Sequence, residues 1–462
     1  MTRPAKLFGT DGIRGRANDH PMTPEMAVQL GRAVAHVFKR TLAADAPDAR
    51  GHRPRIVIGK DTRLSNYMFE TALQAGICSM GVDAVQLGVL PTPGIAFMTT
   101  GMRADAGVVI SASHNPYEDN GIKFFAADGF KLPDEIEAQI EALVASDALF
   151  EHRAHGDQIG RAYRIQDAVG RYSVFLKSSF PRQLDLQGLR VVVDCANGAA
   201  YKVAPEVLYE LGAEVVPLGT SPDGTNINDH VGALHPEHMA HKVRELRADI
   251  GIALDGDADR VILCDAHGRI VDGDRILLVL ARRLKARGAL AKDTVVATIM
   301  SNLGLERALR GIGAHMERVA VGDRYVVEHM RKHGFTLGGE QSGHIVMTDY
   351  ASTGDGMLAA LQVLAVMAET GRPLSDIATG LEVVPQILES VRVQRKPALE
   401  SVPAIRDAIR AAEDALGDAG RVVVRYSGTE PKCRVMLEGD DEHVIRELGQ
   451  VIVDAIQREL VG

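Results

Sequence analysis

The sequence predicts a multidomain α/β protein, and three observations lead to this prediction. The chain has 462 residues, several times the roughly 100–200 residues of an average domain. Short apolar runs that end in Gly, Asp or Asn recur along it, and helical patterns lie between them. Continuous apolar strands that alternate with helices are typical of sheets covered on both faces. The runs lie at 55–63, 108–116, 191–198, 250–260 and 294–302.

Two helices are the clearest of the connecting elements. The first is expected to begin at Pro24, because Thr23 can cap it and proline is favoured at the first helical position. Its apolar face is formed by Met26, Leu30, Ala33, Val34 and Val37. The second runs from Gly356 to Met367, with Leu358, Leu361, Val363 and Leu364 facing inward.

Polar segments at 151–162 and 369–375 mark domain boundaries. After about residue 380 the chain changes to a strand-like LESVRVQ, a helix at 402–416, the runs RVVVRYSG and RVMLEG, and a final helix. This order predicts an α+β module. We therefore expect four domains, at residues 1–158, 159–262, 263–374 and 375–462.

Composition excludes several classes of partner. The net charge is −9 with no dense basic patch, so nucleic acid is not expected as a partner. No apolar run reaches the ~18 residues that would span a bilayer, and the N-terminus lacks the apolar region of a signal peptide. We expect a cytoplasmic protein without membrane attachment. The four cysteines form no Cys-x-x-Cys pair, so neither a disulfide framework nor a zinc site is predicted from them.

The segment LDGDADR places Asp255, Asp257 and Asp259 at alternate positions after an apolar strand. Carboxylates in this pattern can converge on one hard cation, although the chain lacks the Gly and Glu that an EF-hand would have at 260 and 266. Magnesium fits better, because it takes few carboxylates and keeps ligand positions for a phosphate. Arg260 would then contact the phosphate. The alternative is a solvated acidic turn.

The segment VRYSGTEPKCRVMLEG, residues 424–439, offers hydroxyls and backbone N–H groups in a tight turn between two arginines. Such a turn can hold a phosphate, although by itself it is more often an ordinary hairpin. The predicted phosphate-binding residues are Arg425, Ser427, Gly428, Thr429 and Arg434.

The segment LGGEQSGHI, residues 337–345, alternates Glu340, Ser342 and His344 around Gly343. A carboxylate and a hydroxyl on a glycine-containing loop can orient sugar hydroxyls. The alternative is an ordinary glycine-rich turn.

The segment VVISASHNPYEDNGIKFF, residues 108–125, changes from an apolar strand to Ser111, Ser113, His114 and Asn115. Ser113 follows the strand end, where open α/β sheets bind their ligands. It is not part of the Gly-x-Ser-x-Gly turn that hydrolases use for a nucleophilic serine. Taken alone, this segment is a polar loop.

Four motifs in this order resemble the four signatures of the α-D-phosphohexomutase superfamily. They are Ser-His-Asn-Pro at 113–116, DGDADR at 255–260, GEQSGH at 339–344 and RYSGTEP at 425–431, and the resemblance covers the whole chain. It implies three similar α/β domains with mixed sheets and a C-terminal α+β (TBP-like) domain around a central cleft. The segments FGTDGIRG at 8–15, PDGTNIN at 222–228 and TGDGMLAALQVL at 353–364 are most similar to bacterial members that act on glucosamine phosphate.

The resemblance implies an isomerase that is a phosphoprotein, with phosphoserine at Ser113. The enzyme would convert glucosamine 6-phosphate reversibly to glucosamine 1-phosphate through glucosamine 1,6-bisphosphate, and so feed UDP-N-acetylglucosamine and cell-wall synthesis. One Mg²⁺ per chain would be bound by Ser113, Asp255, Asp257 and Asp259. The sugar would contact Glu340, Ser342 and His344. Arg425, Ser427, Gly428, Thr429 and Arg434 would hold the phosphate that does not react.

The resemblance also assigns the charged groups around the serine. Arg14 and Arg63 match arginines that oppose the phosphoserine charge, and Arg260 adds a phosphate contact. Lys123 matches the lysine proposed as general acid or base. His114 and His344 are the other candidates for moving the proton, and the choice among the three stays open at this stage. Asp323 and Arg324 are expected to line the third-domain loop.

Three other functions remain to be distinguished. A phosphoglucomutase or phosphomannomutase would perform the same chemistry on another sugar, a phosphosugar phosphatase would transfer the phosphate to water, and an inactive module would only bind the sugar. The expected small-molecule partner is a phosphorylated amino sugar. Whether the chain forms a homodimer is left open.

Overall fold

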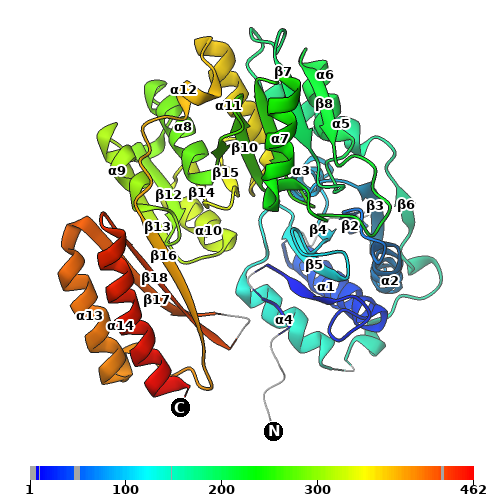
Figure 1. The fold of residues 1–462 in the computed structure, drawn as a ribbon. Coiled ribbons are helices and arrows are strands. Elements are labelled where there is room, and N and C mark those ends of the chain that lie inside the picture. Colours follow the sequence, from blue (N-terminus) through cyan, green and yellow to red (C-terminus); the bar gives the residue numbers. More distant parts are fainter. Residues whose placement is uncertain (1–6, 10, 46–52, 147, 428–430, 462) are drawn as a thin grey trace. The chain divides into compact units, whose positions relative to one another are not determined.

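The structure is a computed structural model that describes residues 7–9, 11–45, 53–146, 148–427 and 431–461 (Figure 1). The chain divides into two compact units. Unit 1 comprises residues 1–298 and 317–379, and unit 2 comprises residues 299–316 and 380–462. Among the helices that the structure describes, none is long and apolar enough to cross a membrane.

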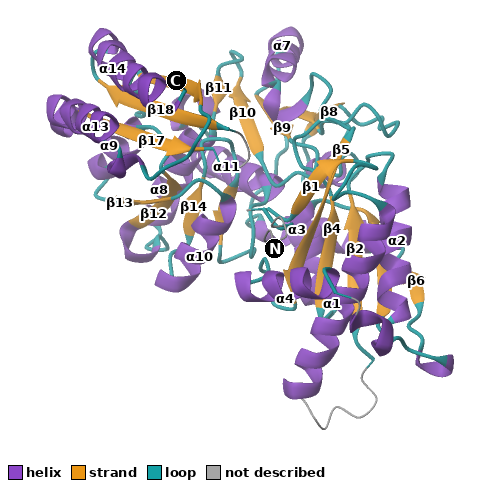
Figure 2. Cartoon of the chain, turned by 90° about the horizontal axis from the view of Figure 1, so that it is seen from below, coloured by secondary structure: helices purple, strands orange, loops and turns teal. Residues whose placement is uncertain are grey.

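The first sheet of unit 1 is mixed, with strand order β1-β5-β4-β2-β3-β6. β2 pairs in parallel with β3 and β4, whereas β5 runs antiparallel to β1 and β4. Figures 1 and 2 show α1 and α2 next to each other beside this sheet. The elements are β1 (Ile13–Arg16), α1 (Pro24–Asp45), β2 (Arg55–Lys60), α2 (Asn66–Ser79), β3 (Asp83–Val89), α3 (Thr92–Gly101), β4 (Ala106–Ile110), β5 (Asp119–Ala126), α4 (Asp134–Val144) and β6 (Ala162–Arg164).

The second sheet has strand order β11-β10-β9-β7-β8. It is also mixed, because β7 is parallel to β8 and β9 while β9 and β10 form an antiparallel hairpin. Its elements are α5 (Ala168–Ser179), β7 (Arg190–Asp194), α6 (Val203–Glu210), β8 (Glu214–Leu218), α7 (Pro236–Leu246), β9 (Ile250–Leu254), β10 (Val261–Asp265) and β11 (Ile270–Val271).

The third sheet has strand order β13-β12-β14-β15. β12 is parallel to β14, and β14 is antiparallel to β15. Its elements are α8 (Gly273–Ala286), β12 (Thr294–Thr298), β13 (His315–Val319), α10 (Asp323–His333), β14 (Leu337–Gly339), β15 (Ile345–Met347), α11 (Gly356–Thr370) and α12 (Leu374–Ile377). All three mixed sheets agree with the α/β prediction.

Unit 2 contains an antiparallel sheet in which β18 lies between β16 and β17. The apolar faces of its last two helices pack on this sheet, with Ile405, Leu437, Ile445 and Ile452 among the buried residues. The elements are α9 (Leu303–Gly311), β16 (Gln386–Arg392), α13 (Pro403–Leu416), β17 (Gly420–Tyr426), β18 (Lys432–Gly439) and α14 (Glu442–Leu460).

Two domain boundaries placed from the sequence fall inside sheets. The boundary after residue 158 precedes β6, which pairs with β3 of the first sheet. The boundary after residue 262 lies within β10, which pairs along its whole length with β9. The sequence pattern suggested a new domain here because β10 reads as a fresh apolar strand. We propose that the first domain extends through β6 and the second through β11.

The contact between α1 and α2 depends on two glycines that allow the helix backbones to approach closely. A Cβ atom at Gly76 would lie 2.3 Å from the Val28 carbonyl oxygen, and one at Gly31 would lie 2.6 Å from the Leu73 carbonyl oxygen. The beginning of α2 directly follows the loop that carries Asp61 and Arg63. The glycine contact therefore helps to place that loop.

We predict that Gly76→Ala destabilises the protein by about 1–3 kcal/mol, since the added methyl group meets backbone that cannot rotate away. This loss should exceed the gain of about 1 kcal/mol that alanine brings to a helix. The measurement is the midpoint of chemical unfolding. The control is Gly170→Ala in α5, where a Cβ meets nothing within 4 Å and stability should stay equal or rise. Equal effects of the two substitutions would contradict the packing argument.

Candidate functional site

The loop that follows β4 holds Ser113 in a buried and constrained position. Ser113 is 1 % exposed, and its φ of +51° lies in the left-handed region that residues other than glycine rarely adopt. Its Oγ donates to Asp255 Oδ2 at 2.6 Å, and its backbone N–H donates to Ser111 Oγ at 2.9 Å. Ser111 in turn donates to Asp61 at 2.6 Å. Backbone strain at a buried polar loop is a feature of functional sites.

Arg63 holds the same loop in place through hydrogen bonds to its backbone. Its Nε donates to Asp61 Oδ2 at 2.9 Å, and its other N–H groups donate to loop carbonyls. All five N–H groups of the guanidinium are thereby matched, with both side chains fully buried. This differs from the phosphate contact expected from the sequence, because Arg63 holds the backbone around the serine. The carbonyls belong to Ser113, Asn115, Pro116 and Asp119.

Three carboxylates face Ser113 from the connection between β9 and β10. Asp255, Asp257 and Asp259 are 1 %, 1 % and 5 % exposed, and each offers an oxygen within 4.8 Å of the others. Ala258, which lies between two of these aspartates, adopts a φ of +58° in the left-handed region. Burial raises the pKa of Asp255 and Asp259, and repulsion among the three carboxylates raises it further.

These aspartates have the donor set that a divalent cation requires. Asp257 Oδ1 and Asp259 Oδ1 are buried and have no hydrogen-bond partner among the described residues. A buried carboxylate oxygen without a partner is costly, and a hard cation with oxygen ligands would satisfy both. The residues therefore fit Mg²⁺, and the Ser113 hydroxyl lies beside them.

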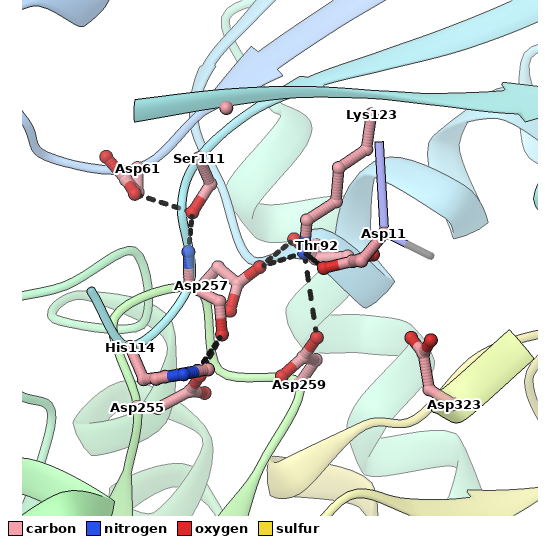
Figure 3. Close-up of polar contacts among 12 residues, drawn as sticks. Asp11, Asp61, Thr92, Ser111, His114, Lys123, Asp255, Asp257, Asp259 and Asp323 are labelled. Atoms are coloured by element: carbon pink, nitrogen blue, oxygen red, sulfur yellow. Dashed lines mark hydrogen bonds and ion pairs between the residues drawn. The ribbon is translucent and has the colours of Figure 1, made fainter. Parts of the chain in front are cut away.

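Lys123 enters the acidic cluster from β5 (Figure 3). Its Nζ lies 3.0 Å from Asp257 Oδ2, 3.0 Å from Asp11 Oδ2 and 3.9 Å from Asp259 Oδ2. Burial alone would lower the pKa of Lys123, but the carboxylates of Asp11, Asp257 and Asp259 outweigh burial and raise it above its usual value. Lys123 is therefore a stable ammonium beside the serine loop.

Asp11 and Lys131 are site residues that the sequence analysis did not single out. Asp11 forms ion pairs with Lys123, Lys131 and Arg14. Lys131 also pairs with Asp323 at the start of α10, so this chain of charges joins the first sheet to the third. Asp11 lies in the segment FGTDGIRG, in which Arg14 was selected because it matches a family arginine near the phosphoserine and Asp11 was not selected. No sequence signal indicated Lys131.

The loop between β14 and β15 brings His344 to the same place. His344 is 1 % exposed, and among the described residues neither ring nitrogen has a hydrogen-bond partner. Its Nε2 lies 3.7 Å from Asp323 Oδ2. Glycine is required at 354, since a Cβ there would lie 2.4 Å from His344 Nε2. An antiparallel bridge pairs His344 with Arg260 of the aspartate loop, so the two motifs are neighbours.

Glu340 and Ser342 lie on the same loop as His344. The Ser342 hydroxyl donates to Glu340 Oε2 at 3.1 Å, and the Gly322 N–H donates to Glu340 Oε1 at 3.2 Å. Their side chains therefore form one polar group that is preorganised beside the start of α10. Arg324, in the first turn of α10, turns away from this group and pairs with Glu137 and Asp134.

His114 lies next to the serine, with its Nδ1 3.3 Å from Ser113 Oγ. Burial, followed by the charges of Arg260 and Arg14, lowers the pKa of His114 to about 3. The imidazole is therefore neutral at ordinary pH. Neutral His114 can accept a hydrogen bond but is a poor general acid.

The remaining predicted phosphate ligands lie in unit 2. Arg425 on β17 and Arg434 on β18 are directly opposite in the strand register, an arrangement that is unfavourable for like charges. Burial, followed by the charge of Arg434, lowers the pKa of Arg425. Ser427 is buried and its N–H donates to the Lys432 carbonyl at 2.8 Å. Gly428 and Thr429 lie outside the described residues. An anion between the arginines would relieve their repulsion.

Comparison with known proteins identifies the family to which this arrangement belongs. Models of the phosphoglucomutase/phosphomannomutase α/β/α domains I, II and III match residues 5–150, 171–268 and 272–383, and the C-terminal domain model matches residues 388–455. The chain belongs to the phosphoglucomutase/phosphomannomutase family. This assignment confirms the phosphohexomutase superfamily and its four-domain α/β fold, and thereby an enzyme of the phosphotransferring isomerase class.

Relatives within this family are similar over almost the full chain. The phosphoglucosamine mutase of Syntrophotalea carbinolica is 58 % identical over 455 residues, which cover 98 % of each chain. The phosphoglucosamine mutase of Anaeromyxobacter dehalogenans is 59 % identical over 465 residues, with 99 % of each covered.

Solved structures with the same fold are more distant in sequence. A phosphoglucomutase/phosphomannomutase family protein of Burkholderia thailandensis is 24 % identical, with a TM-score of 0.80 over 98 % of this chain and 97 % of the other. The Aspergillus fumigatus N-acetylphosphoglucosamine mutase, solved with GlcNAc-6P and magnesium, is 18 % identical, with a TM-score of 0.67 over 98 % and 96 %. Because their sequence identity to this chain is below 25 %, these structures support the fold only.

We predict that Arg63→Met lowers the free energy of unfolding by about 3–5 kcal/mol, because it leaves the buried Asp61 carboxylate and several carbonyls without their partner. Denaturant unfolding measures the loss. The control is Arg171→Met, which breaks an exposed ion pair with Asp167 and should change stability by no more than about 0.5 kcal/mol. A small effect at Arg63 would show that the loop does not depend on this side chain.

We predict that His114 makes the protein less stable in mild acid. The unfolded chain protonates this histidine below about pH 6.5, whereas the folded protein, with a pKa of about 3, does not. The unfolded state therefore binds more protons, and stability falls as the pH drops below 6.5. At pH 5 the loss should be about 1–2 kcal/mol, and His114→Asn should remove it. The test is to measure the unfolding midpoints of the wild type and of His114→Asn at pH 7 and pH 5, with a chelator present. An equal change of midpoint with pH in the two proteins would refute the prediction.

Proposed function

We propose that the protein interconverts glucosamine 6-phosphate and glucosamine 1-phosphate through a phosphoserine at Ser113. The observation that carries the proposal is the hydrogen bond from Ser113 Oγ to Asp255, which places a nucleophilic oxygen at a buried group of three carboxylates. Support for the substrate comes from relatives named phosphoglucosamine mutase at 56–59 % identity.

The proposed reaction has two phosphoryl transfers. In the first, the C1 hydroxyl oxygen of glucosamine 6-phosphate attacks the phosphorus of phosphoserine, the P–Oγ bond breaks, and glucosamine 1,6-bisphosphate forms. The bisphosphate then turns around. In the second transfer, Ser113 Oγ attacks the phosphorus of the 6-phosphate. The bond between this phosphorus and the sugar O6 breaks, and glucosamine 1-phosphate leaves. Each transfer moves one proton between a sugar hydroxyl and the serine oxygen.

Asp255, Asp257 and Asp259 would hold one Mg²⁺ in this scheme. The ion would supply neutralising charge for the phosphoryl group. The protein's own cations, Lys123 and Arg260, add to this effect, because phosphoryl transfer depends mainly on positioning and charge stabilisation. Arg14 lies in the same network through Asp11 and opposes the charge of the phosphoserine.

The choice of proton carrier can be narrowed by charge. Neutral His114 is assigned to accepting a hydrogen bond near Ser113. Lys123 is assigned the role of general acid, because the carboxylates keep it protonated; a bound cation would partly cancel those carboxylates and bring its pKa closer to a useful range. His344 is the candidate base, because its buried ring nitrogens have no hydrogen-bond partner among the described residues.

The substrate's other groups are assigned to the remaining motifs. Glu340 and Ser342 would bind the sugar hydroxyls in either orientation of the bisphosphate. Arg425, Ser427 and Arg434, together with Gly428 and Thr429, would bind the phosphate that is not reacting and so set its distance from the reacting serine.

Intact-mass measurement tests the phosphoserine. We expect one added phosphate on the purified wild-type protein after incubation with glucose 1,6-bisphosphate, and none on Ser113→Ala. The matched control is Ser178→Ala on α5, which removes a hydroxyl that donates to the Phe175 carbonyl within the same helix, and this variant should still be phosphorylated. Phosphate on Ser113→Ala, or full turnover by that variant, would refute the proposed carrier.

Substrate comparison tests the sugar and the reaction class. We expect kcat/KM to be highest for glucosamine 6-phosphate, with lower values for glucose and mannose 6-phosphates, because a few hydroxyl contacts discriminate only modestly. A preference for glucose or mannose would indicate a phosphoglucomutase or phosphomannomutase. Steady release of inorganic phosphate with no sugar 1-phosphate would indicate a phosphatase instead.

A further inference from the structure

We propose that unit 1 carries a second metal site, for a zinc-type divalent ion, formed by Glu317, His329 and His333. The site is separate from the aspartate group, and none of its residues takes part in the proposed reaction. Glu317 lies on β13, and both histidines lie on α10. The inference rests on these ligands alone and does not depend on the proposed function.

The three side chains already converge. His329 and His333 are spaced i, i+4, so that both rings lie on one face of α10, with ring centroids 4.4 Å apart. His329 Nε2 contacts Glu317 Oε2 at 2.5 Å. Each residue offers a ligand atom within 4.8 Å of the others. Tetrahedral zinc needs ligand atoms about 3.3–3.5 Å apart, given bonds of about 2.0–2.2 Å, so small side-chain rotations suffice.

The donor set selects the class of ion. Two imidazoles and one carboxylate suit zinc, copper or nickel, whereas magnesium and calcium prefer oxygen ligands. Lys292 reinforces this choice, because its Nζ donates to the His333 carbonyl at 2.7 Å and places a positive charge nearby. The Lys292 ammonium repels any cation at this position. An ion that also forms bonds to the histidine nitrogens can offset this repulsion, whereas an ion bound by charge alone cannot.

The site is accessible, and the helix dipole of α10 offsets part of the repulsion from Lys292. The side chains of His329 and Glu317 are 26 % and 44 % exposed, which leaves room for a water or an external ligand. His333 is the last residue of α10, and the C-terminal end of a helix dipole favours positive charge. His329 also stacks on Phe335, with ring centroids 5.9 Å apart, which limits the motion of its ring.

A bound ion would restrain one edge of the proposed active site. It would tie β13 to α10 across residues 320–322, the loop that donates the Gly322 N–H to Glu340. The same helix begins with Asp323, the partner of Lys131. Metal binding would therefore stabilise the segment that contains Gly322 and Asp323.

Zinc titration of the full chain in excess Mg²⁺ tests the proposal. We expect the wild-type protein to bind one more Zn²⁺ than the double variant His329→Gln/His333→Gln, and its melting temperature to rise on adding zinc. Losing a second-shell partner already weakens metal binding by about 10–100-fold, so each single variant should lose at least about 100-fold in affinity. Excess Mg²⁺ keeps the aspartate group occupied during the titration.

The control variant is His241→Gln on α7. His241 also has a carboxylate at i, i+4, with its Nε2 3.8 Å from Glu245 Oε2, but it belongs to no three-ligand group among the described residues. Zinc binding should therefore be unchanged. Copper provides a second readout, because electron paramagnetic resonance should report two coupled nitrogens in the wild type and one in His333→Gln. Equal zinc stoichiometry in the wild type and the double variant, with all proteins folded, would overturn the proposal.

Discussion

The centre of unit 1 depends on one constraint, which is that three carboxylates are buried within a few ångströms of one another. Burying ionised groups is costly unless they are paired. The structure offsets this cost with three cations: Lys123 comes from β5, Arg14 from β1, and Arg260 from the end of the aspartate loop itself. The electrostatic balance therefore requires the first and second sheets to meet at this point.

The three cations do not fully compensate the buried carboxylates. The pKa values of Asp255 and Asp259 remain raised, and two buried carboxylate oxygens lack hydrogen-bond partners among the described residues. Such incomplete satisfaction is typical of a site that awaits a ligand. In unit 2 the sign is reversed, because two arginines face each other on paired strands. The proposed magnesium ion would neutralise the carboxylates, and the proposed phosphate would lie between the arginines.

The position of the serine is also held by buried polar contacts. Ser113 is held in a left-handed backbone conformation, which costs about 1–3 kcal/mol. Arg63 offsets that strain by binding the surrounding carbonyls while its own charge is neutralised by Asp61. In the proposed reaction the serine oxygen would then carry a phosphoryl group in a fixed direction, which is the positioning that phosphoryl transfer needs from a protein.

The sequence by itself determined the α/β class, the first long helix and the motifs that supply most of the site. These features are local: a strand followed by alternating aspartates, a capped helix at Thr23–Pro24, and a serine after a strand can each be recognised within about ten residues. The Thr23 cap is present, since the Met26 N–H donates to its hydroxyl.

Only the tertiary structure decided which side chains act together. Asp11 and Lys131 could not be selected from the sequence, because a carboxylate becomes a site residue only when strand pairing brings it to Lys123. Arg63 reads as a phosphate ligand until four of its N–H groups are seen to bind carbonyls around the serine, with the fifth bound to Asp61. The His329–His333 pair can be read from the sequence, but its third ligand, Glu317, lies on another element and is found only in the structure. The physical reason is the same in each case: hydrogen bonds and ion pairs between residues far apart in the chain depend on sheet order and register, which local patterns do not encode.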